Sequence, residues 1–218
     1  MTAVLNPLVR MSKHVLDILL PNHCLHCGQP SADYVCARCF SSCPFELKSF
    51  DLEGLTVWSV TPYDGVMKTC LHHIKFESHT PLMAAWTSAL KQAAIPLPDP
   101  GYDLWTIVPG SPDRIRRRGW DVAQVLFENW QPFPSDRHHI LLSRTRNTAP
   151  LFELSPTERM RELEGAFCMA SNTEVKGKHI LVADDIFTLG TTVSACAKIL
   201  MAAGARQVSG FALCYPLA

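Results

Sequence analysis

The fold of this chain is most clearly indicated by one run, Ile180-Leu-Val-Ala-Asp-Asp-Ile-Phe-Thr-Leu-Gly-Thr-Thr192. An apolar segment, expected to be a buried strand, ends in the adjacent carboxylates of Asp184 and Asp185. A short Thr/Gly loop follows, and then a helical segment over 193–203. Backbone N–H groups at such a turn can hold a phosphate, and paired carboxylates accept hydrogen bonds from vicinal sugar hydroxyls. The run therefore predicts a site for a phosphorylated sugar.

Two other interpretations of this run are open. It could be a buried strand with a solvated acidic end and an ordinary helix start, which explains the residues without assigning a ligand. It could also be the acidic strand of a nucleotide triphosphatase. The chain has no Gly-x-x-x-x-Gly-Lys-Ser/Thr loop, which argues against that second alternative.

The rest of the chain alternates between strand and helix patterns. Apolar periodicity predicts strands at 55–60, 104–108, 139–142, 166–170, 179–183 and 207–214, and helices at 63–76, 81–94, 122–130 and 193–203. This alternation predicts an α/β fold with a parallel sheet flanked by helices. Ligands bind at the carboxyl ends of strands in such sheets, so Pro109 and Gly110 should share an edge with the acid pair.

Five of the nine cysteines lie between residues 24 and 43. Four of them form two Cys-x-x-Cys knuckles, with Cys24 and Cys27 in the first and Cys36 and Cys39 in the second. Four thiolates satisfy tetrahedral Zn²⁺ in a closed structural site, so we predict a zinc finger over residues 21–45. A pair of thioredoxin-like redox motifs would need a βαβ context that is missing here. Three further residues are alternative ligands: Cys43, His23 and His26.

The bulk properties set limits on the architecture. The 218 residues are enough for one core plus a small appendage. Twenty basic and twenty acidic residues cancel, so the net charge favours no particular partner. We expect four segments: an amphipathic helix at 1–20, the zinc finger at 21–45, a connector at 46–54 and the main domain at 55–218.

The N-terminal segment does not read as a membrane anchor. Its most apolar stretch, residues 16–21, is too short to span a bilayer. No small-residue cleavage site follows, so a signal peptide is not expected and the predicted location is cytoplasmic.

The densest positive charge lies in a segment expected to be a loop, and comprises Arg114, Arg116, Arg117 and Arg118. Guanidinium groups suit phosphate oxygens, so this segment is a candidate for binding pyrophosphate, single-stranded DNA or both. Stacking surfaces for bases could come from Trp105, Trp120 and Trp130. The alternative is a solvated surface loop with its tryptophans in the core.

Taken together, these features resemble the ComF family of phosphoribosyltransferase-like proteins. Besides the knuckles and the acid-pair run, the resemblance rests on Tyr63-Asp64-Gly65, Ile74-Lys75-Phe76, Val108-Pro109, Arg118-Gly119-Trp120, Arg144, Thr148, Glu158-Arg159, Gly165-Ala166-Phe167 and Ala203-Gly204-Ala205. It covers nearly the whole chain. It implies a type I phosphoribosyltransferase domain behind a small zinc finger, a link to natural transformation and the use of external DNA, and binding of phosphoribosyl pyrophosphate and of single-stranded DNA.

The resemblance also implies roles for individual residues. Asp184 and Asp185 would bind the ribose hydroxyls and are the catalytic candidates. The 5′-phosphate would be wrapped by Thr188, Leu189, Gly190, Thr191 and Thr192. Pyrophosphate would face the turn at Pro109 and Gly110, with Mg²⁺ bridging ribose and pyrophosphate oxygens. Residues 143–165 would be a mobile loop over the site. Competence-machinery proteins and a second copy of the chain are the partners implied.

The departures from the family pattern include four positions at which an apolar or acidic side chain replaces a neutral polar one: Val122, Leu151, Glu162 and Leu189. Backbone N–H groups can still hold a phosphate, so ribose-phosphate binding is the safer expectation and turnover the less secure one. The departures favour an alternative function, that of a catalytically inactive nucleic-acid-binding adaptor that keeps the transferase fold. A third hypothesis is a nucleotide-sensing regulator.

Overall fold

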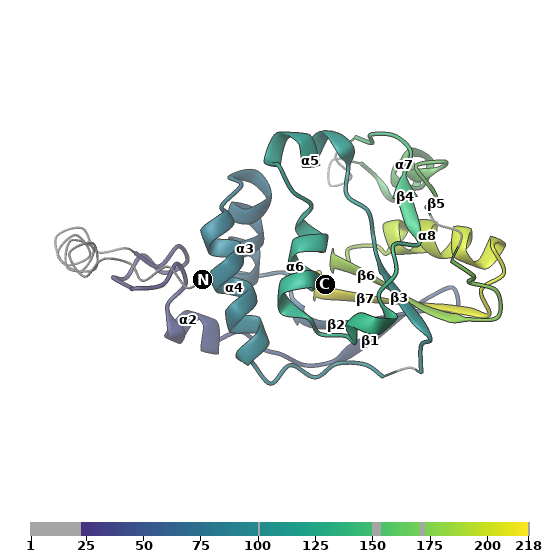
Figure 1. The fold of residues 1–218 in the computed structure, drawn as a ribbon. Coiled ribbons are helices and arrows are strands. Elements are labelled where there is room, and N and C mark those ends of the chain that lie inside the picture. Colours follow the sequence, from purple (N-terminus) through teal and green to yellow (C-terminus); the bar gives the residue numbers. More distant parts are fainter. Residues whose placement is uncertain (1–22, 100, 150–153, 171–172, 218) are drawn as a thin grey trace, which may run out of the picture.

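The computed structural model describes residues 23–99, 101–149, 154–170 and 173–217 (Figure 1). The amphipathic helix predicted at 1–20 lies outside these residues. At the centre is a five-stranded sheet in the order β1 (Lys48–Leu52), β2 (Leu55–Pro62), β7 (Gln207–Tyr215), β6 (His179–Ile186) and β3 (Leu104–Ile107). Strands β2, β7, β6 and β3 run parallel, and β1 is antiparallel to β2. The predicted α/β class with a mainly parallel sheet is confirmed.

The two faces of the sheet carry different helices. On one face lie α3 (Gly65–Phe76), α4 (Thr80–Gln92) and α6 (Val122–Trp130), whose apolar residues pack with Leu181 and Phe211. On the other face α8 (Thr191–Ala202) packs with Ile180 and Val182, and α7 (Pro156–Leu163) lies against α8 (Figure 1). Because successive residues of a strand point to opposite faces, β6 contributes to both cores, as its continuous apolar run indicates.

The predicted connector at 46–54 contains a strand. Residues Lys48–Leu52 pair in register with β2, and Leu52 lies opposite Leu55. The two residues between them, Glu53 and Gly54, both have positive φ, at 54° and 89°. A two-residue turn of this kind matches the twist of an antiparallel pair, so the connector folds back as the outer strand of a hairpin.

The loop predicted around the arginines is wrong, because this segment forms a helix, α5 (Pro112–Arg118). Pro112 stands in its first turn, where a missing N–H does no harm, and Gly119 ends it with a left-handed φ of 90°. The consequence is that the arginine side chains are spaced around a helix instead of along an extended loop.

The described residues of the segment 143–165 also contain regular structure, which the lack of periodicity did not predict. The short strand β4 (Leu142–Arg144) pairs with β5 (Phe167–Met169) in a separate two-stranded sheet. Helix α7 begins with a capping box, in which Ser155 accepts from the Glu158 N–H and the Glu158 side chain accepts from Ser155. Two further short helices are α2 (Ala37–Ser41) and the 3₁₀ turn η1 (Ser135–Arg137). Among the helices of the described ranges, none is both long enough and apolar enough to cross a bilayer.

Candidate functional site

The two predicted carboxylates lie at the carboxyl end of β6, in unequal surroundings. Asp185 is 7% exposed, and its carboxylate accepts a hydrogen bond from the Lys75 ammonium of α3 at 2.8 Å. Asp184 is half-buried and accepts from the Asp185 backbone N–H at 2.8 Å. Lys75 therefore links the acid pair to α3, which lies on the same face of the sheet as α4 and α6.

Burial changes the proton affinity of this pair. Desolvation, reinforced by the charge of Asp185, raises the pKa of Asp184 to about 8. Desolvation alone would lower the pKa of Lys75, but the neighbouring carboxylates outweigh it and the net shift is upward. At neutral pH Asp184 thus keeps a proton in the unliganded protein, while Asp185 is matched by a cation.

The loop after β6 leads into α8 through an unusual start. Gly190 has a left-handed φ of 69° and no side chain caps the helix. A side chain at position 190 would collide with Leu52 and Phe187, so glycine is required there. The first N–H groups of a helix have no partner within it, and here they follow the two exposed residues Thr188 and Leu189. The arrangement offers backbone donors to an anion.

The turn after β3 lies beside the acid pair. The Val108 N–H donates to the Ala183 carbonyl at 2.9 Å, so Pro109 and Gly110 leave the sheet at the edge where Asp184 follows. The Gly110 N–H donates to Asp121 at 2.7 Å, and the same carboxylate caps α6. Burial raises the pKa of Asp121, although its N–H donors oppose the shift.

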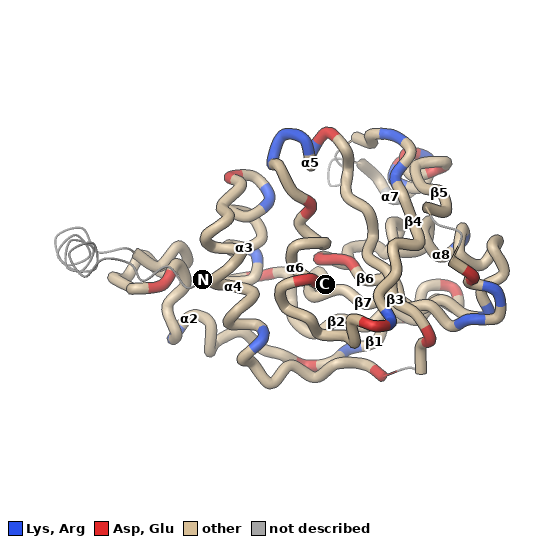
Figure 2. The backbone as a smooth tube through the Cα atoms, viewed as in Figure 1, with Lys and Arg blue, Asp and Glu red and all other residues tan. Residues whose placement is uncertain are grey.

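The four arginines of α5 do not act as one cluster. Arg114, Arg116 and Arg117 are exposed. In Figure 2 the tube at α5 is largely blue, the colour of Lys and Arg. Arg118 is half-buried, and its guanidinium donates twice to the Lys75 carbonyl, at 3.2 and 2.6 Å. Arg118 therefore ties α5 to the helix that carries Lys75, and only the other three are available to a large anionic partner.

The tryptophans fit the predicted stacking role poorly. Trp105 and Trp130 are 3% and 4% exposed and belong to the apolar core on the α6 side of the sheet. Trp120 is half-buried, with the Arg118 guanidinium 5.6 Å from its ring centroid. Of the three, Trp120 alone keeps part of a ring accessible to a base.

The four predicted zinc ligands come together. The sulfurs of Cys24, Cys27, Cys36 and Cys39 all lie within 4.8 Å of one another. The Cys27 and Cys36 sulfurs are 3.9 Å apart, close to the ~3.8 Å edge of a tetrahedron with Zn–S bonds of about 2.3 Å. This cluster can hold a metal ion such as Zn²⁺.

The alternative zinc ligands are placed differently. The Cys43 thiol points to the Cys39 carbonyl at 3.7 Å, and burial raises its pKa to about 11, which disfavours the thiolate. The His26 imidazole bonds the Thr69 hydroxyl at 3.0 Å, and His23 is exposed. Within the described residues the metal-ligating cluster comprises the four knuckle cysteines.

Three residues of the site escaped the sequence analysis: Lys75, Asp121 and Arg144. Arg144 donates to the Pro109 carbonyl at 3.4 Å and also bonds the Thr148 hydroxyl. Lys75 and Arg144 stand in the motifs of the family resemblance, and Asp121 directly follows one of them. The contacts of these three residues span 11 to 110 positions, which spacing along the chain does not give.

The departures from the family pattern have visible consequences. Val122 is buried at the start of α6, and Leu189 is 47% exposed in the loop before α8. Glu162 accepts from the Ala149 N–H at 2.9 Å and pairs with Arg146, so it fastens the predicted mobile loop. Leu151 lies outside the described residues.

No family model matches the chain, but curated relatives do. The DNA utilization protein YhgH of Salmonella typhi is 29% identical over 209 residues, covering 89% of this chain and 84% of that protein. The competence protein ComFC of Bacillus subtilis (strain 168) is 28% identical over 156 residues, covering 71% and 62%. ComFC of Streptococcus pneumoniae is 27% identical over 160 residues, covering 73% and 68%. A solved structure titled "Structure of the allosteric regulatory enzyme of purine biosynthesis" matches at a TM-score of 0.38 and 19% identity, over 66% of this chain and 30% of that one.

Proposed function

We propose that this chain, which belongs to the ComF family, binds phosphoribosyl pyrophosphate with Mg²⁺ at the end of β6 and serves in the use of external DNA. The observation that carries the sugar-phosphate part is the sequence of two carboxylates, a left-handed Gly190 and an uncapped helix at one sheet edge. The names of the relatives, DNA utilization protein and competence protein, support the part that concerns DNA.

The acid pair suits a ribose diol. Asp185, paired with Lys75, accepts hydrogen bonds, whereas protonated Asp184 can both donate and accept. Each of the two neighbouring ribose hydroxyls needs a hydrogen-bond partner in a defined position. Asp184 and Asp185, adjacent at the end of β6, can each provide one. Lys75 also offsets one negative charge, which lowers the repulsion between the pair and an incoming phosphate.

The 5′-phosphate would sit at the start of α8. The free N–H groups of Thr191 and Thr192 and the positive end of the helix macrodipole favour a dianion there. Thr188 can add a hydroxyl, and the Arg159 guanidinium lies 3.4 Å from it. Leu189 supplies no hydroxyl to the phosphate. Backbone N–H groups would therefore make a larger share of the phosphate contacts than they would if position 189 were a Thr.

The pyrophosphate would face Pro109 and Gly110. Asp121 occupies the Gly110 N–H, so the turn is held in one shape before a ligand arrives. Mg²⁺, when bound with the ligand, would neutralise pyrophosphate oxygens and keep several of its own waters. The residues of the chain then bind, orient and shield the sugar, while closure of the segment around α7 would exclude water.

Calorimetric titration of phosphoribosyl pyrophosphate with Mg²⁺ into zinc-loaded protein tests the proposal. We expect saturable binding by the wild type and a loss of at least about tenfold in Asp184→Asn/Asp185→Asn, since the lost hydrogen bonds, a charge-assisted one at Asp185 and a neutral one at Asp184, are together worth more than about 1.4 kcal/mol. Asp136→Asn, an exposed carboxylate in η1, is the matched control and should bind as the wild type does. A folded wild type that takes up no ligand would refute the proposal.

A second candidate function is a nucleic-acid-binding adaptor without turnover. It is favoured by the three exposed arginines of α5 and by the exposed Leu189. Anisotropy of a labelled single-stranded oligonucleotide, measured against salt, tests it. If Arg114, Arg116 and Arg117 each neutralise a phosphate, replacing all three by Gln should flatten the slope of log K against log salt by about 2. An unchanged slope would exclude these residues as the contact.

A further inference from the structure

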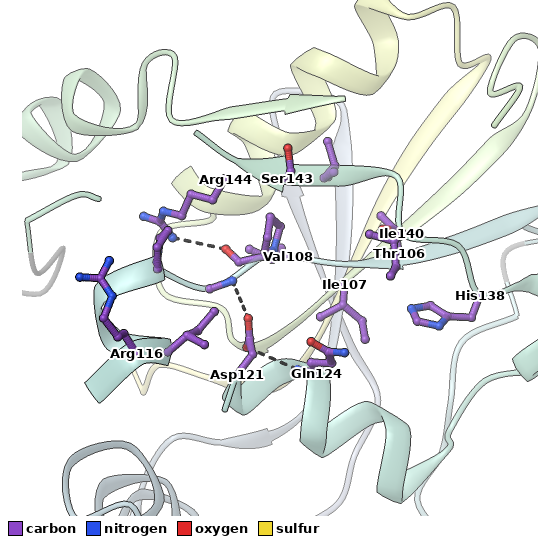
Figure 3. A pocket seen from close by; sticks show the side chains of 15 residues that line it. Thr106, Ile107, Val108, Arg116, Asp121, Gln124, His138, Ile140, Ser143 and Arg144 are labelled. Atoms are coloured by element: carbon purple, nitrogen blue, oxygen red, sulfur yellow. Dashed lines mark hydrogen bonds between the residues drawn. The ribbon is translucent and has the colours of Figure 1, made fainter. Parts of the chain in front are cut away.

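A cavity of about 510 Å³ opens at the free edge of β3 (Figure 3). Its walls come from β3, α5, the start of α6, the segment after η1 and β4. Pro109 and Gly110 line it, but Asp184 and Asp185 do not. The cavity thus shares the proposed pyrophosphate turn with the sugar-phosphate site but leaves out its acid pair. Its volume falls within the range of about 300–1,000 Å³ that is usual for small-molecule sites.

The two ends of the cavity differ in chemistry. Figure 3 shows the guanidinium groups of Arg116 and Arg144 toward one end and the His138 ring at the other, with Ile107 between them. A ligand that fills this length needs an anionic end, an apolar middle and a flat far end.

Arg144 lies over the Phe167 ring, 5.0 Å from its centroid, but has no carboxylate partner among the described residues. The residue is half-buried, and its Nε is buried without a hydrogen-bond partner. No carboxylate of the described ranges lies within 4.0 Å of this guanidinium, whose other nitrogens reach only a carbonyl and a hydroxyl. A desolvated cation without a counterion is unfavourable, and a bound phosphate would remove that penalty.

Arg116 can join the same anion. Its side chain is 76% exposed, and it pairs with Asp113 at 3.2 Å on the surface of α5. An exposed pair of this kind is weak, so the guanidinium can turn to a stronger acceptor. Together the two arginines define a phosphate position at one end of the cavity.

The opposite end suits a flat ring. His138 stacks on Trp105 with ring centroids 4.2 Å apart at 30°, and burial lowers the pKa of His138, so its ring is neutral at pH 7. Ile140 is 67% exposed at the rim, and Leu142 lines the wall. Two aliphatic side chains and an aromatic face are what a nucleobase stacks against.

At the edge of β3, main-chain N–H and C=O groups can form hydrogen bonds with the edge of a nucleobase. Val108 bonds β6 through its N–H, whereas the Trp105 carbonyl accepts from His139 on the other side of the strand. Alternation along a strand therefore turns the peptide groups of Ile107 toward the edge away from β6, beyond the point where His138 and His139 pair with Trp105. A nucleobase presents matching donors and acceptors along its edge.

We propose that this cavity binds one nucleotide, with its base beside His138 and Ile140 and its phosphate on Arg144 and Arg116. This site goes beyond the proposed sugar-phosphate site, because phosphoribosyl pyrophosphate has a ribose but no nucleobase to fill the apolar end. The nucleotide can be a free mononucleotide or one residue of a single strand, since both present the same base, sugar and phosphate.

Calorimetric titration of deoxyadenosine 5′-monophosphate into the full zinc-loaded chain tests the proposal. Deoxyadenosine and inorganic phosphate, which fill one end each, should bind at least about tenfold more weakly. Ile140→Asp, which places a charge at the rim, and Arg116→Met should each weaken the mononucleotide by about tenfold. Arg144→Met should do the same, with its thermal melt as the check on folding. Arg161→Met, an exposed arginine on α7 away from the cavity, is the matched control and should bind as the wild type does.

The outcomes separate this site from the acid pair. Asp184→Asn/Asp185→Asn should keep its affinity for the mononucleotide. No binding by the folded wild type, unchanged binding by Ile140→Asp, or loss only in the acid-pair variant would overturn the proposal. A single-stranded oligonucleotide that displaces the mononucleotide and is itself weakened by Ile140→Asp would identify a strand residue as the occupant. Failure to displace it would assign the cavity to free nucleotides.

Discussion

Lys75 makes two chemically identical neighbours unequal. Its ammonium lies 2.8 Å from Asp185, whereas Asp184 has the Asp185 N–H as its hydrogen-bond donor. Desolvation and the adjacent charge then raise the pKa of Asp184 to about 8. Asp184 therefore stays protonated at neutral pH beside the Lys75-paired carboxylate of Asp185, which gives the pair both a donor and an acceptor for sugar hydroxyls.

The raised pKa predicts a pH-dependent stability. Asp184 has a pKa of about 8 in the folded chain, against about 3.9 when unfolded. Its favourable contribution is therefore complete below pH 4 and is lost as the pH rises through 8. Asp184→Asn cannot titrate, so its free energy of unfolding in urea should fall less than that of the wild type between pH 5 and 8.5. Parallel curves for the two proteins would contradict the assignment.

The ion pair itself predicts a coupling between two substitutions. Lys75→Met leaves Asp185 buried without its partner, at a cost of about 3–5 kcal/mol. Adding Asp185→Asn removes the uncompensated charge, so the double variant should be more stable than Lys75→Met alone. Urea unfolding of the wild type, both single variants and the double variant measures this. Purely additive losses would mean that the two side chains do not interact.

Among single residues, the sequence predicted those features of the site that are made by residues close together in the chain. The acid pair and the cysteine knuckles can be recognised in the sequence, because residues that are adjacent or three apart in the chain are also close together in space. Lys75 is 110 residues from Asp185, and no local pattern indicates that α3 delivers it there. Arg118 likewise read as a free cation, although it is held by the Lys75 carbonyl.

At the scale of elements, local chemistry explains what periodicity missed. Helices α5 and α7 are short, so their few apolar residues give little periodicity, but both have a Ser-Pro start and α7 has a capping box. Strand β1 follows from the Glu53–Gly54 turn rather than from its own residues, of which most are exposed. The long β6 and β7, buried on both faces, were predicted well because their apolar runs are continuous.

The packing at the start of α8 predicts that replacing Gly190 lowers the stability of the protein by more than backbone strain alone would. Gly190→Ala forces a side chain into a left-handed residue, at about 1–2 kcal/mol, and against Leu52 and Phe187, at about 1–3 kcal/mol more. Gly177 has a similar φ of 72° with open space around it, so Gly177→Ala should cost the strain alone. Chemical unfolding midpoints compare the two. Equal costs would show that the loop does not pack on β1 as described.

At the scale of the whole molecule, the cysteine module is continuous with the core. Cys24 and Cys39 belong to the same apolar cluster as α3 and α4. Tyr34 meets His79 with ring centroids 4.7 Å apart, and His26 bonds Thr69. Because α3 also carries Lys75, one helix contacts the metal-binding module at one side and the acid pair at the other.

This continuity predicts that metal loss destabilises more than the module. We expect one zinc per chain, and chelation should lower the melting temperature of the whole domain because folding of the module depends on the metal. Cys24→Ser should reduce zinc content. Cys43→Ser should retain it, because the Cys43 thiol lies outside the cluster. Elemental analysis and thermal melts measure both effects, and a Cys43→Ser protein as poor in zinc as Cys24→Ser would contradict the ligand set.

A crystal structure of the chain with phosphoribosyl pyrophosphate and Mg²⁺ tests the central proposal most directly. We predict the 5′-phosphate within hydrogen-bond distance of the Thr191 and Thr192 N–H groups, and the ribose hydroxyls on Asp184 and Asp185. A bound ligand whose phosphate lies away from the start of α8, with the acid pair making no contact to it, would contradict the account.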